Sequence, residues 1–166
     1  SDGRTLYVAS TAGNRVRSVD LETRMMSTLA GQTNAGYADG TGAAASFADI
    51  RDVCLNANQT LLFVADGCSL RTISSIGAVV STIAGGSCNG TVPAGPSETI
   101  TDGASAVMYP SGLARAVGTE LLYFSDYLGH AVREYNIATG ITTTVAGTLL
   151  GMSGQMDATG ASARFD

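Results

Sequence analysis

Short apolar runs recur along the whole chain, and glycine, asparagine, aspartate or serine bounds each of them. The runs are rich in β-branched and aromatic side chains, which is the pattern of β-strands separated by turns. No stretch keeps a period of about 3.6 residues over a dozen positions, so the pattern predicts almost no helix. We therefore expect an all-β protein.

Three anchor patterns return in the same order in three successive units of the chain. The first anchor reads "LYVAS", "LFVAD" and "LYFSD", and it starts at Leu6, Leu62 and Leu122. The second is an apolar residue followed by arginine, at Arg17, Arg71 and Arg133. The third reads "MMSTLAG", "VVSTIAG" and "ITTTVAG", and it ends at Gly31, Gly85 and Gly147. A repeat of this kind indicates stacked copies of one structural unit.

The middle unit predicts four strands, at Ile50–Leu55, Leu61–Ala65, Leu70–Ser74 and Val79–Ala84. Short turns make neighbouring strands pair in an antiparallel meander. A repeated four-stranded meander is the blade of a β-propeller. The expected fold is thus three consecutive propeller blades in one segment, 1–166. The blades are placed at about 1–47, 48–106 and 107–166, and the first lacks its opening strand.

The series "LYVAS…GNRVR…D…STLAG…GYADGTGAAASF" resembles the NHL repeat of β-propellers. The third unit, "PSGLA…LLYFSDYLGHAVREYN…TTTVAG…DATGASARF", is similarly close, and the likeness covers essentially the whole chain. The middle unit departs from the pattern in a clipped turn, Asp66–Ser69, and in a longer linker, "GSCNGTVPAGPSETITDGASAVMY". The resemblance implies a rigid platform with variable loops. It does not imply any one function.

Three blades are too few for a closed ring, which takes about 4–8 blades. The open sheet edges expose backbone groups that seek a partner. Three outcomes stay open: part of a longer ring, a ring closed by two copies, or copies joined head to tail in a fibre. The expected partners are accordingly another protein, or further copies of this chain at the open blade edges.

The charge balance narrows the class of partner. The net charge is −5, and all 9 basic residues are arginine. An acidic, lysine-free surface is a poor match for a phosphate backbone, so no nucleic acid is expected. No run approaches the ~18–20 apolar residues of a membrane span. No apolar leader stands at Ser1, so we expect any secretion signal to have been removed or to lie outside this sequence.

The cysteines are placed by strand direction. In each unit the second strand ends and the third begins at one face of the propeller, which we call the turn face. Cys68 and Cys88 fall at the turn face, and Cys54 falls at the opposite face among apolar neighbours. We predict a Cys68–Cys88 disulfide and a buried Cys54 thiol, with three unrelated reduced cysteines as the alternative.

Two N-glycosylation sequons begin at Asn58 and Asn89, both in expected turns. The sequons, the acidity, the absence of lysine and the possible disulfide favour an extracellular or secretory glycoprotein.

Candidate catalytic chemistry is sparse. His130 is the single histidine, and it aligns with Asn14 of the first unit, so we interpret it as a turn residue. The Asp-Gly type elements at Asp39, Asp102 and Asp157 resemble pieces of calcium loops but lack the alternating acidic ligands. We interpret them as local Asx turns. No catalytic residue, metal or cofactor is therefore assigned, and the protein is not expected to be an enzyme.

The recurring arginines, Arg17, Arg71 and Arg133, suggest either an anion-binding stripe or ion pairs within each blade. Asp66 and Asp126 are the natural partners in two of the three blades. We expect these pairs to be exposed, each contributing under about 1 kcal/mol.

A contact surface is expected where apolar and aromatic side chains stand at turn tips. The candidates are Tyr37, Tyr109, Tyr127, Leu128 and His130, with ordinary surface exposure as the alternative. The favoured function is a non-catalytic protein-binding or assembly module of NHL type. The alternatives are a repeating structural subunit of an extracellular fibre or coat, and part of a metal-dependent propeller lyase or lactonase. An RNA-binding module is the weakest hypothesis, because the charge has the wrong sign.

Overall fold

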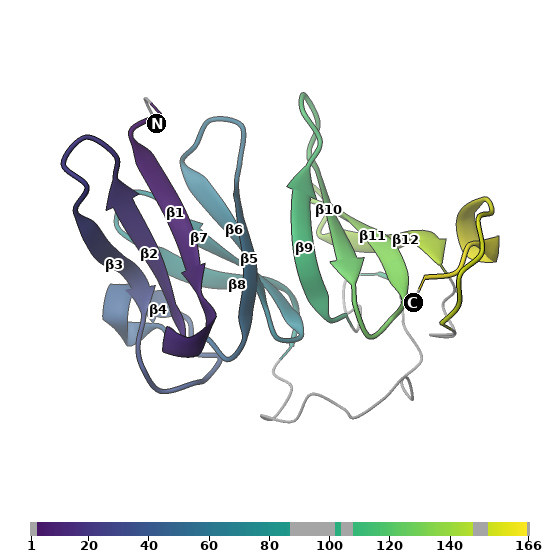
Figure 1. Cartoon of the computed structure of the whole chain (residues 1–166), viewed down its shortest axis with the longest axis horizontal. Helices are drawn as coiled ribbons and strands as arrows, with labels where there is room; N and C mark the ends of the chain where they lie inside the picture. Colours follow the sequence, from purple (N-terminus) through teal and green to yellow (C-terminus); the bar gives the residue numbers. More distant parts are fainter. Residues whose placement is uncertain (1–2, 87–101, 104–107, 148–152, 166) are drawn as a thin grey trace.

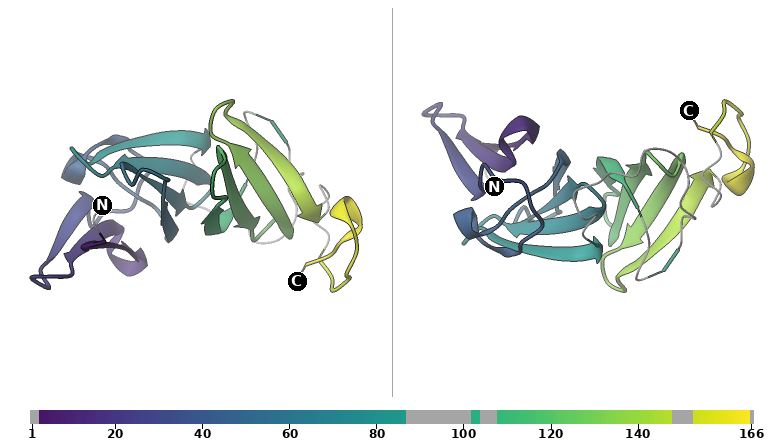
Figure 2. Two further views of the ribbon diagram at one scale, coloured as in Figure 1. Left: turned by 90° about the horizontal axis from the view of Figure 1, so that it is seen from above. Right: turned by 90° about the horizontal axis from the view of Figure 1, so that it is seen from below.

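The computed structural model describes residues 3–86, 102–103, 108–147 and 153–165. Three antiparallel sheets follow one another along the chain and fan out side by side (Figures 1 and 2). Each sheet is built on an antiparallel meander, so the prediction of an all-β protein made of consecutive propeller blades is confirmed.

The strands of each sheet are consecutive in sequence, apart from one short addition. The first sheet has the order β1 (Thr5–Ser10), β2 (Arg15–Asp20), β3 (Met26–Gly31), with the 3₁₀ turn η1 (Thr11–Gly13) after β1. The second contains β5 (Ile50–Leu55), β6 (Leu61–Asp66), β7 (Ser69–Ser74) and β8 (Val79–Gly85). The third contains β9 (Pro110–Arg115), β10 (Leu121–Asp126), β11 (Ala131–Asn136) and β12 (Ile141–Gly147). The four strands predicted for the middle unit agree with β5 to β8, and each bound differs by at most one residue.

The addition is β4 (Gly40–Thr41), a short strand that the sequence did not predict. It lies in the linker after the first blade, and it pairs with β8 at the outer edge of the second sheet, Gly40 opposite Val80. The 3₁₀ turn η2 (Gly42–Ala44) follows it. The linker that leaves one blade therefore completes the sheet of the next.

Two apolar clusters fill the spaces on either side of the middle sheet. Strand β6 serves both, because successive side chains of a strand point to opposite faces. Leu62 and Val64 belong to the cluster shared with the first blade, and Phe63 to the cluster shared with the third. All three are at most 1% exposed. This burial on both faces explains why "LLFVA" is continuously apolar rather than alternating.

Backbone conformation explains why the third anchor ends in glycine in all three units. Gly31, Gly85 and Gly147 have φ values of +98°, +79° and +96°, a region that side-chain-bearing residues rarely adopt. A Cβ added to them would clash with the carbonyl oxygen of the residue just before the neighbouring strand, which is Asn14, Cys68 and His130 respectively. In all three sheets the pairing register also shifts just before the recurring arginine. The repeat thus preserves both a bulge in the strand and, two residues after the bulged position, a backbone conformation that favours glycine.

Hydrogen bonds tie adjacent blades together. Thr11 Oγ1 of the first blade donates to Ile50 O of the second at 2.7 Å. Leu113 N of the third blade donates to Asp52 Oδ2 of the second, also at 2.7 Å. In the ranges that the structure describes, no helix has the length and apolar character needed to cross a bilayer.

Candidate functional site

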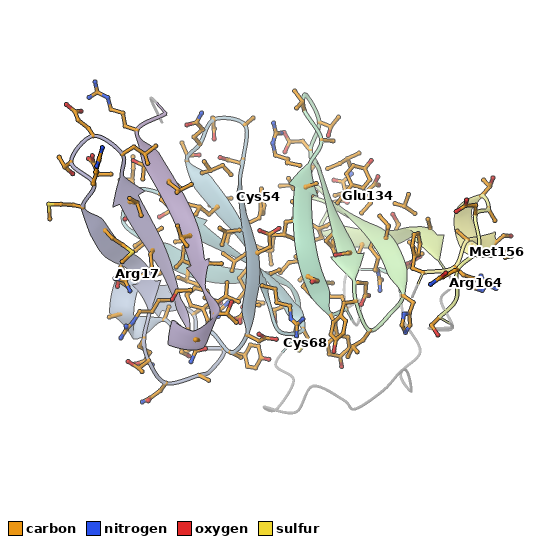
Figure 3. All side chains as sticks on the ribbon, viewed as in Figure 1. Arg17, Cys54, Cys68, Glu134, Met156 and Arg164 are labelled. Carbon is orange, nitrogen blue, oxygen red and sulfur yellow. The ribbon has the colours of Figure 1, made fainter. Side chains whose placement is uncertain are left out.

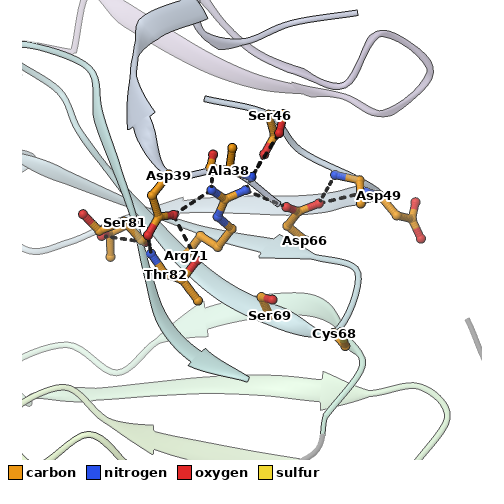
Figure 4. Close-up of polar contacts among 12 residues, drawn as sticks. Ala38, Asp39, Ser46, Asp49, Asp66, Cys68, Ser69, Arg71, Ser81 and Thr82 are labelled. Atoms are coloured by element: carbon orange, nitrogen blue, oxygen red, sulfur yellow. Dashed lines mark hydrogen bonds and ion pairs between the residues drawn. The ribbon is translucent and has the colours of Figure 1, made fainter. Parts of the chain in front are cut away.

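Arg71, on β7, is the centre of a buried cluster of charged and polar groups (Figure 4). Its side chain is fully buried. One terminal nitrogen donates to Asp66 Oδ2 at 3.0 Å and to Ser46 O at 2.6 Å. The other donates to Asp39 Oδ1 at 2.7 Å and to Ala38 O at 2.8 Å. The guanidinium also lies over the Phe47 ring, 4.8 Å from its centroid. We call this set the arginine cluster of the second blade.

The two carboxylates of this cluster have different environments. Asp66 is fully buried, and its Oδ1 accepts the N–H groups of Ala48 and Asp49, both at 2.8 Å. Burial raises the pKa of Asp66, against hydrogen bonds from Asp49, Arg71 and Ala48 that lower it. By accepting the N–H groups of Ala48 and Asp49, Asp66 holds the segment just before β5 against the rest of the second blade.

Asp39 is half exposed, and it joins the linker to β8. Its carboxylate accepts from Thr82 N and Thr82 Oγ1, each at 3.0 Å, as well as from Arg71. Partial burial acts to raise the pKa of Asp39, but the hydrogen bonds from Thr82 and Arg71 outweigh it and hold the pKa below the usual 3.8.

The third blade repeats the arrangement. Arg133 is fully buried and donates to Asp126 Oδ2 at 3.0 Å and to Asp102 Oδ1 at 3.2 Å. Asp126 Oδ1 accepts Tyr109 N, and Asp102 accepts Thr144 Oγ1 at 2.9 Å. Arginine, inner aspartate, linker aspartate and threonine therefore recur as one unit.

The first blade lacks the inner carboxylate. Ser10 stands where the other blades have Asp66 and Asp126. Among the described residues, Arg17 makes no hydrogen bond or ion pair, and its Nε is buried without a partner. Arg17 nevertheless occupies the same register position, since it lies between Val8 and Thr28 as Arg71 lies between Val64 and Thr82.

These contacts correct two expectations. The pairs of Arg71 with Asp66 and of Arg133 with Asp126 exist, but they are buried rather than exposed. Linker residues, including Ser46 and Phe47, lie against Arg71. Asp39 and Asp102 bind arginines on the following blade rather than forming only local turns. A signal for this was present in the sequence, because the linker aspartate precedes its arginine by 32 residues in one case and by 31 in the other.

The predicted contact residues separate into exposed and covered ones. Tyr127 is 44% exposed, whereas Tyr109 is 8% exposed and adds little accessible area. Tyr37, Leu128 and His130 are partly buried. Tyr127 belongs to a second group on the turn face, in which the guanidinium of Arg51 lies 4.7 Å from the centre of the Tyr127 ring. Asp49 fixes that guanidinium through an ion pair of 2.8 Å.

Cys54 and Cys68 lie at opposite ends of the second blade (Figure 3). Cys54 is free and half-buried, so the burial expected of its thiol is partial. Burial and the nearby Asp52 raise the pKa of Cys54 to about 11, against a smaller lowering by Arg115. Cys68 Sγ lies 2.8 Å from the carbonyl oxygen of Gly86. Cys88 lies outside the described residues, so the Cys68–Cys88 disulfide stays a prediction.

The remaining candidates are turn residues. His130 and Asn14 have φ values of 47° and 50°, so the alignment of the two positions is confirmed by a shared left-handed backbone. Asn58 is exposed, and Asn89 lies outside the described residues. Within the described ranges, no three His, Cys, Asp or Glu side chains gather in a way that would hold a metal ion.

Solved structures support the fold. A structural genomics protein of unknown function from Bacteroides thetaiotaomicron matches 98% of this chain with a TM-score of 0.70 and 18% identity. An auxiliary nutrient binding protein from the same organism matches 90% with a TM-score of 0.63 and 15% identity. The extracellular domain of a putative one-component system from that organism matches 87% with a TM-score of 0.52 and 12% identity.

At these identities the likeness shows an all-β, propeller-like fold and nothing finer. The matched segment spans 38%, 35% and 16% of the length of those three chains. No protein-family model and no curated protein sequence matches the chain, so membership of the NHL family stays a prediction.

Proposed function

We propose that the chain is a non-catalytic protein-binding module built from NHL-type propeller blades, and that it binds its partner on the turn face. The observation that carries the proposal is the exposed Tyr127 ring, stacked under Arg51. Tyrosine and arginine dominate the energetics of protein interfaces, because each offers a large contact area together with polar groups. This ordered pair, with Tyr127 in the β10–β11 turn and Arg51 on β5, is the anchor for the protein partner.

The anchor is held in place before binding. Tyr127 N donates to Tyr109 O at 3.1 Å, and Arg51 is fixed by its ion pair with Asp49. A preorganised side chain loses less conformational entropy on association, so more of its contact energy appears as affinity.

The names of similar structures are compatible with this role. One is called an auxiliary nutrient binding protein, and another is the extracellular domain of a putative one-component system. Both names describe those proteins, and they favour a binding role outside the cytoplasm for this chain. The exposed sequon at Asn58 supports the same location.

The binding role is tested by cross-linking the protein to its partner in the medium of its own source and identifying the cross-linked peptides. The partner is then purified and titrated. Tyr127→Ala is expected to weaken binding at least about tenfold, as is usual for a central aromatic anchor. Val117→Ser is the control, since Val117 is 91% exposed on the β9–β10 connection at the opposite end of the blade. Equal affinities for wild type and Tyr127→Ala would contradict the proposal.

We also propose the Cys68–Cys88 disulfide, since Gly86, which contacts Cys68, stands only two residues before Cys88. Intact mass should rise by about 2 Da on reduction, and a single cysteine, Cys54, should alkylate in the unreduced protein. Alkylation of all three cysteines without reductant would exclude the bridge.

A further inference from the structure

The joint between the first and second blades shows how one blade receives the linker of another. We call residues 36–47 the linker loop. Its Asp39 accepts hydrogen bonds from Arg71 and Thr82 of the second blade, and its β4 pairs with β8. Phe47 closes the joint, fully buried over Arg71.

The joint between the second and third blades uses the same three side-chain types. Asp102 accepts from Arg133 and from Thr144 Oγ1, and Gly103 bridges to Thr142 as β4 pairs with β8. The recurrence in a linker of different length indicates that aspartate, arginine and threonine define the joint.

Residues 154–165, which we call the tail loop, resemble the linker loop in sequence and in conformation. Gly154 N donates to Phe165 O at 2.9 Å, as Gly36 N donates to Phe47 O at 3.1 Å. The turn η3 (Gly160–Ser162) matches η2, and the glycine that begins each has a φ of 56°. The turn η3 contacts β12 as η2 contacts β3.

Unlike the linker loop, the tail loop leaves uncovered the side chains that should meet a blade. Asp157 aligns with Asp39, but it has no hydrogen-bonding partner among the described residues. Phe165 aligns with the fully buried Phe47, yet it is 37% exposed. Met156 beside Asp157 is 49% exposed. The tail loop therefore has the conformation of a linker loop but, among the described residues, makes none of the linker loop's side-chain contacts with a following blade.

The first blade carries the matching surface. Arg17 and Thr28 stand at the register positions of Arg71 and Thr82, and Arg17 has no partner in the described chain. Strand β3 is an edge strand with one side unpaired. Met26 there is 57% exposed, whereas its equivalent on β8, Val80, is 1% exposed under the linker loop.

A single molecule does not bring these two surfaces together. The first blade and the tail loop lie at opposite ends of the row of blades (Figures 1 and 2). Arg17 is at one end and Met156, next to Asp157, is at the other (Figure 3). Between two copies of the 166-residue protein, the tail loop of one and the first blade of the other can form the missing joint.

We infer that the tail loop of one copy docks on β2 and β3 of a second copy of this chain. Asp157 of the first copy accepts hydrogen bonds from Arg17 and Thr28 of the second, Phe165 covers that Arg17, and the backbone before η3 pairs with β3. The opposite charges of Asp157 and Arg17 select this arrangement over a joint between two first blades or two tail loops. This self-association is separate from partner binding on the turn face.

Sedimentation velocity of the 166-residue protein over a range of concentrations tests the inference. The wild type is expected to exceed the 16.8 kDa of one chain as concentration rises, either as a pair or as longer chains of copies. Asp157→Arg or Arg17→Asp alone should weaken association at least about tenfold, because each sets like charges against one another in the joint. An equimolar mixture of the two variants should associate again, since both kinds of joint between them carry opposite charges.

The matched controls are Glu120→Arg and Arg115→Asp in and beside the β9–β10 connection, which change the net charge equally and should associate like the wild type. Far-ultraviolet circular dichroism verifies that each variant keeps its sheets. A wild type that stays at 16.8 kDa at every concentration would overturn the inference, as expected if a different chain fills the first blade. Association that neither charge reversal weakens, or that mixing fails to restore, would also overturn it. Because Tyr127→Ala should leave self-association intact, failure here is distinguishable from failure of the binding role.

Discussion

Replacing Arg71 by methionine, and separately Arg17 by methionine, compares one residue type in two environments. Both arginines stand at the same register position of their blades, opposite Thr82 and Thr28 respectively. Only Arg71 meets carboxylates. Methionine keeps much of the apolar stem, so the comparison isolates the loss of the guanidinium.

The expected magnitude follows from what each substitution leaves behind. Arg71→Met strands the fully buried carboxylate of Asp66 and leaves the carbonyl oxygens of Ala38 and Ser46 without their donor. Removing one member of a buried ion pair typically costs about 3–5 kcal/mol, because the other charge stays desolvated. Arg17→Met breaks no hydrogen bond or ion pair in the described chain, so its cost should stay within about 1 kcal/mol.

Urea unfolding followed by circular dichroism measures both costs, at concentrations low enough for the protein to be monomeric. In thermal unfolding, Arg71→Met should lower the midpoint by about 10 °C, and Arg17→Met by no more than about 4 °C. Arg71→Lys should fall in between, since an ammonium keeps the charge but not the forked geometry. If Arg71→Met and Arg17→Met lowered the free energy of unfolding equally, the reasoning would be refuted, because the ion pairs of Arg71 with Asp66 and Asp39 would then contribute nothing measurable.

Three other perturbations test separate features. In urea unfolding, Gly85→Ala should lower the free energy of unfolding by at least about 1–2 kcal/mol, because Gly85 has a positive φ and an added Cβ would clash with Cys68 O. Gly86→Ala is the control and should change that free energy little, because a Cβ at Gly86 meets nothing within 4 Å. The Cys54 thiol, with its pKa raised from 9.0 to about 11, should react with iodoacetamide near pH 8 about a hundredfold more slowly than an unperturbed thiol, and an equal rate would contradict the burial argument. Because the pKa of Asp39 is lowered in the folded state, its contribution is present above about pH 4 and lost as the pH falls through the folded value. The difference in free energy of unfolding between wild type and Asp39→Asn should therefore shrink below about pH 4, and a constant difference would exclude ionised Asp39 as its source.

Much of the fold was predictable, because its signals are local. Alternating or continuous apolar runs reflect which faces of a strand are covered, and the Ala-Gly of the third anchor reflects a positive φ at Gly31, Gly85 and Gly147. The partners of Arg71 and Arg133 within their blades were also predictable, because Asp66 and Asp126 end the neighbouring strand.

The burial of those pairs was not predictable in the same way, because it depends on how the linker between blades folds over the arginine. The role of Asp39 was missed for a related reason. It lies 32 residues before Arg71 and belongs to the linker of a different blade, so only the packing of one unit against the next brings the two together. The exposed fraction of Tyr109 depends likewise on its surroundings rather than on its residue type.

The sequence by itself determined that this protein is a row of antiparallel blades, since strand length, turn residues and glycine positions act within a few residues of one another. Only the tertiary structure decided that each linker aspartate binds the arginine of the following blade and that Arg17 and Asp157 are left at opposite ends. Those facts depend on how whole blades stack, and stacking brings together residues that lie far apart along the chain.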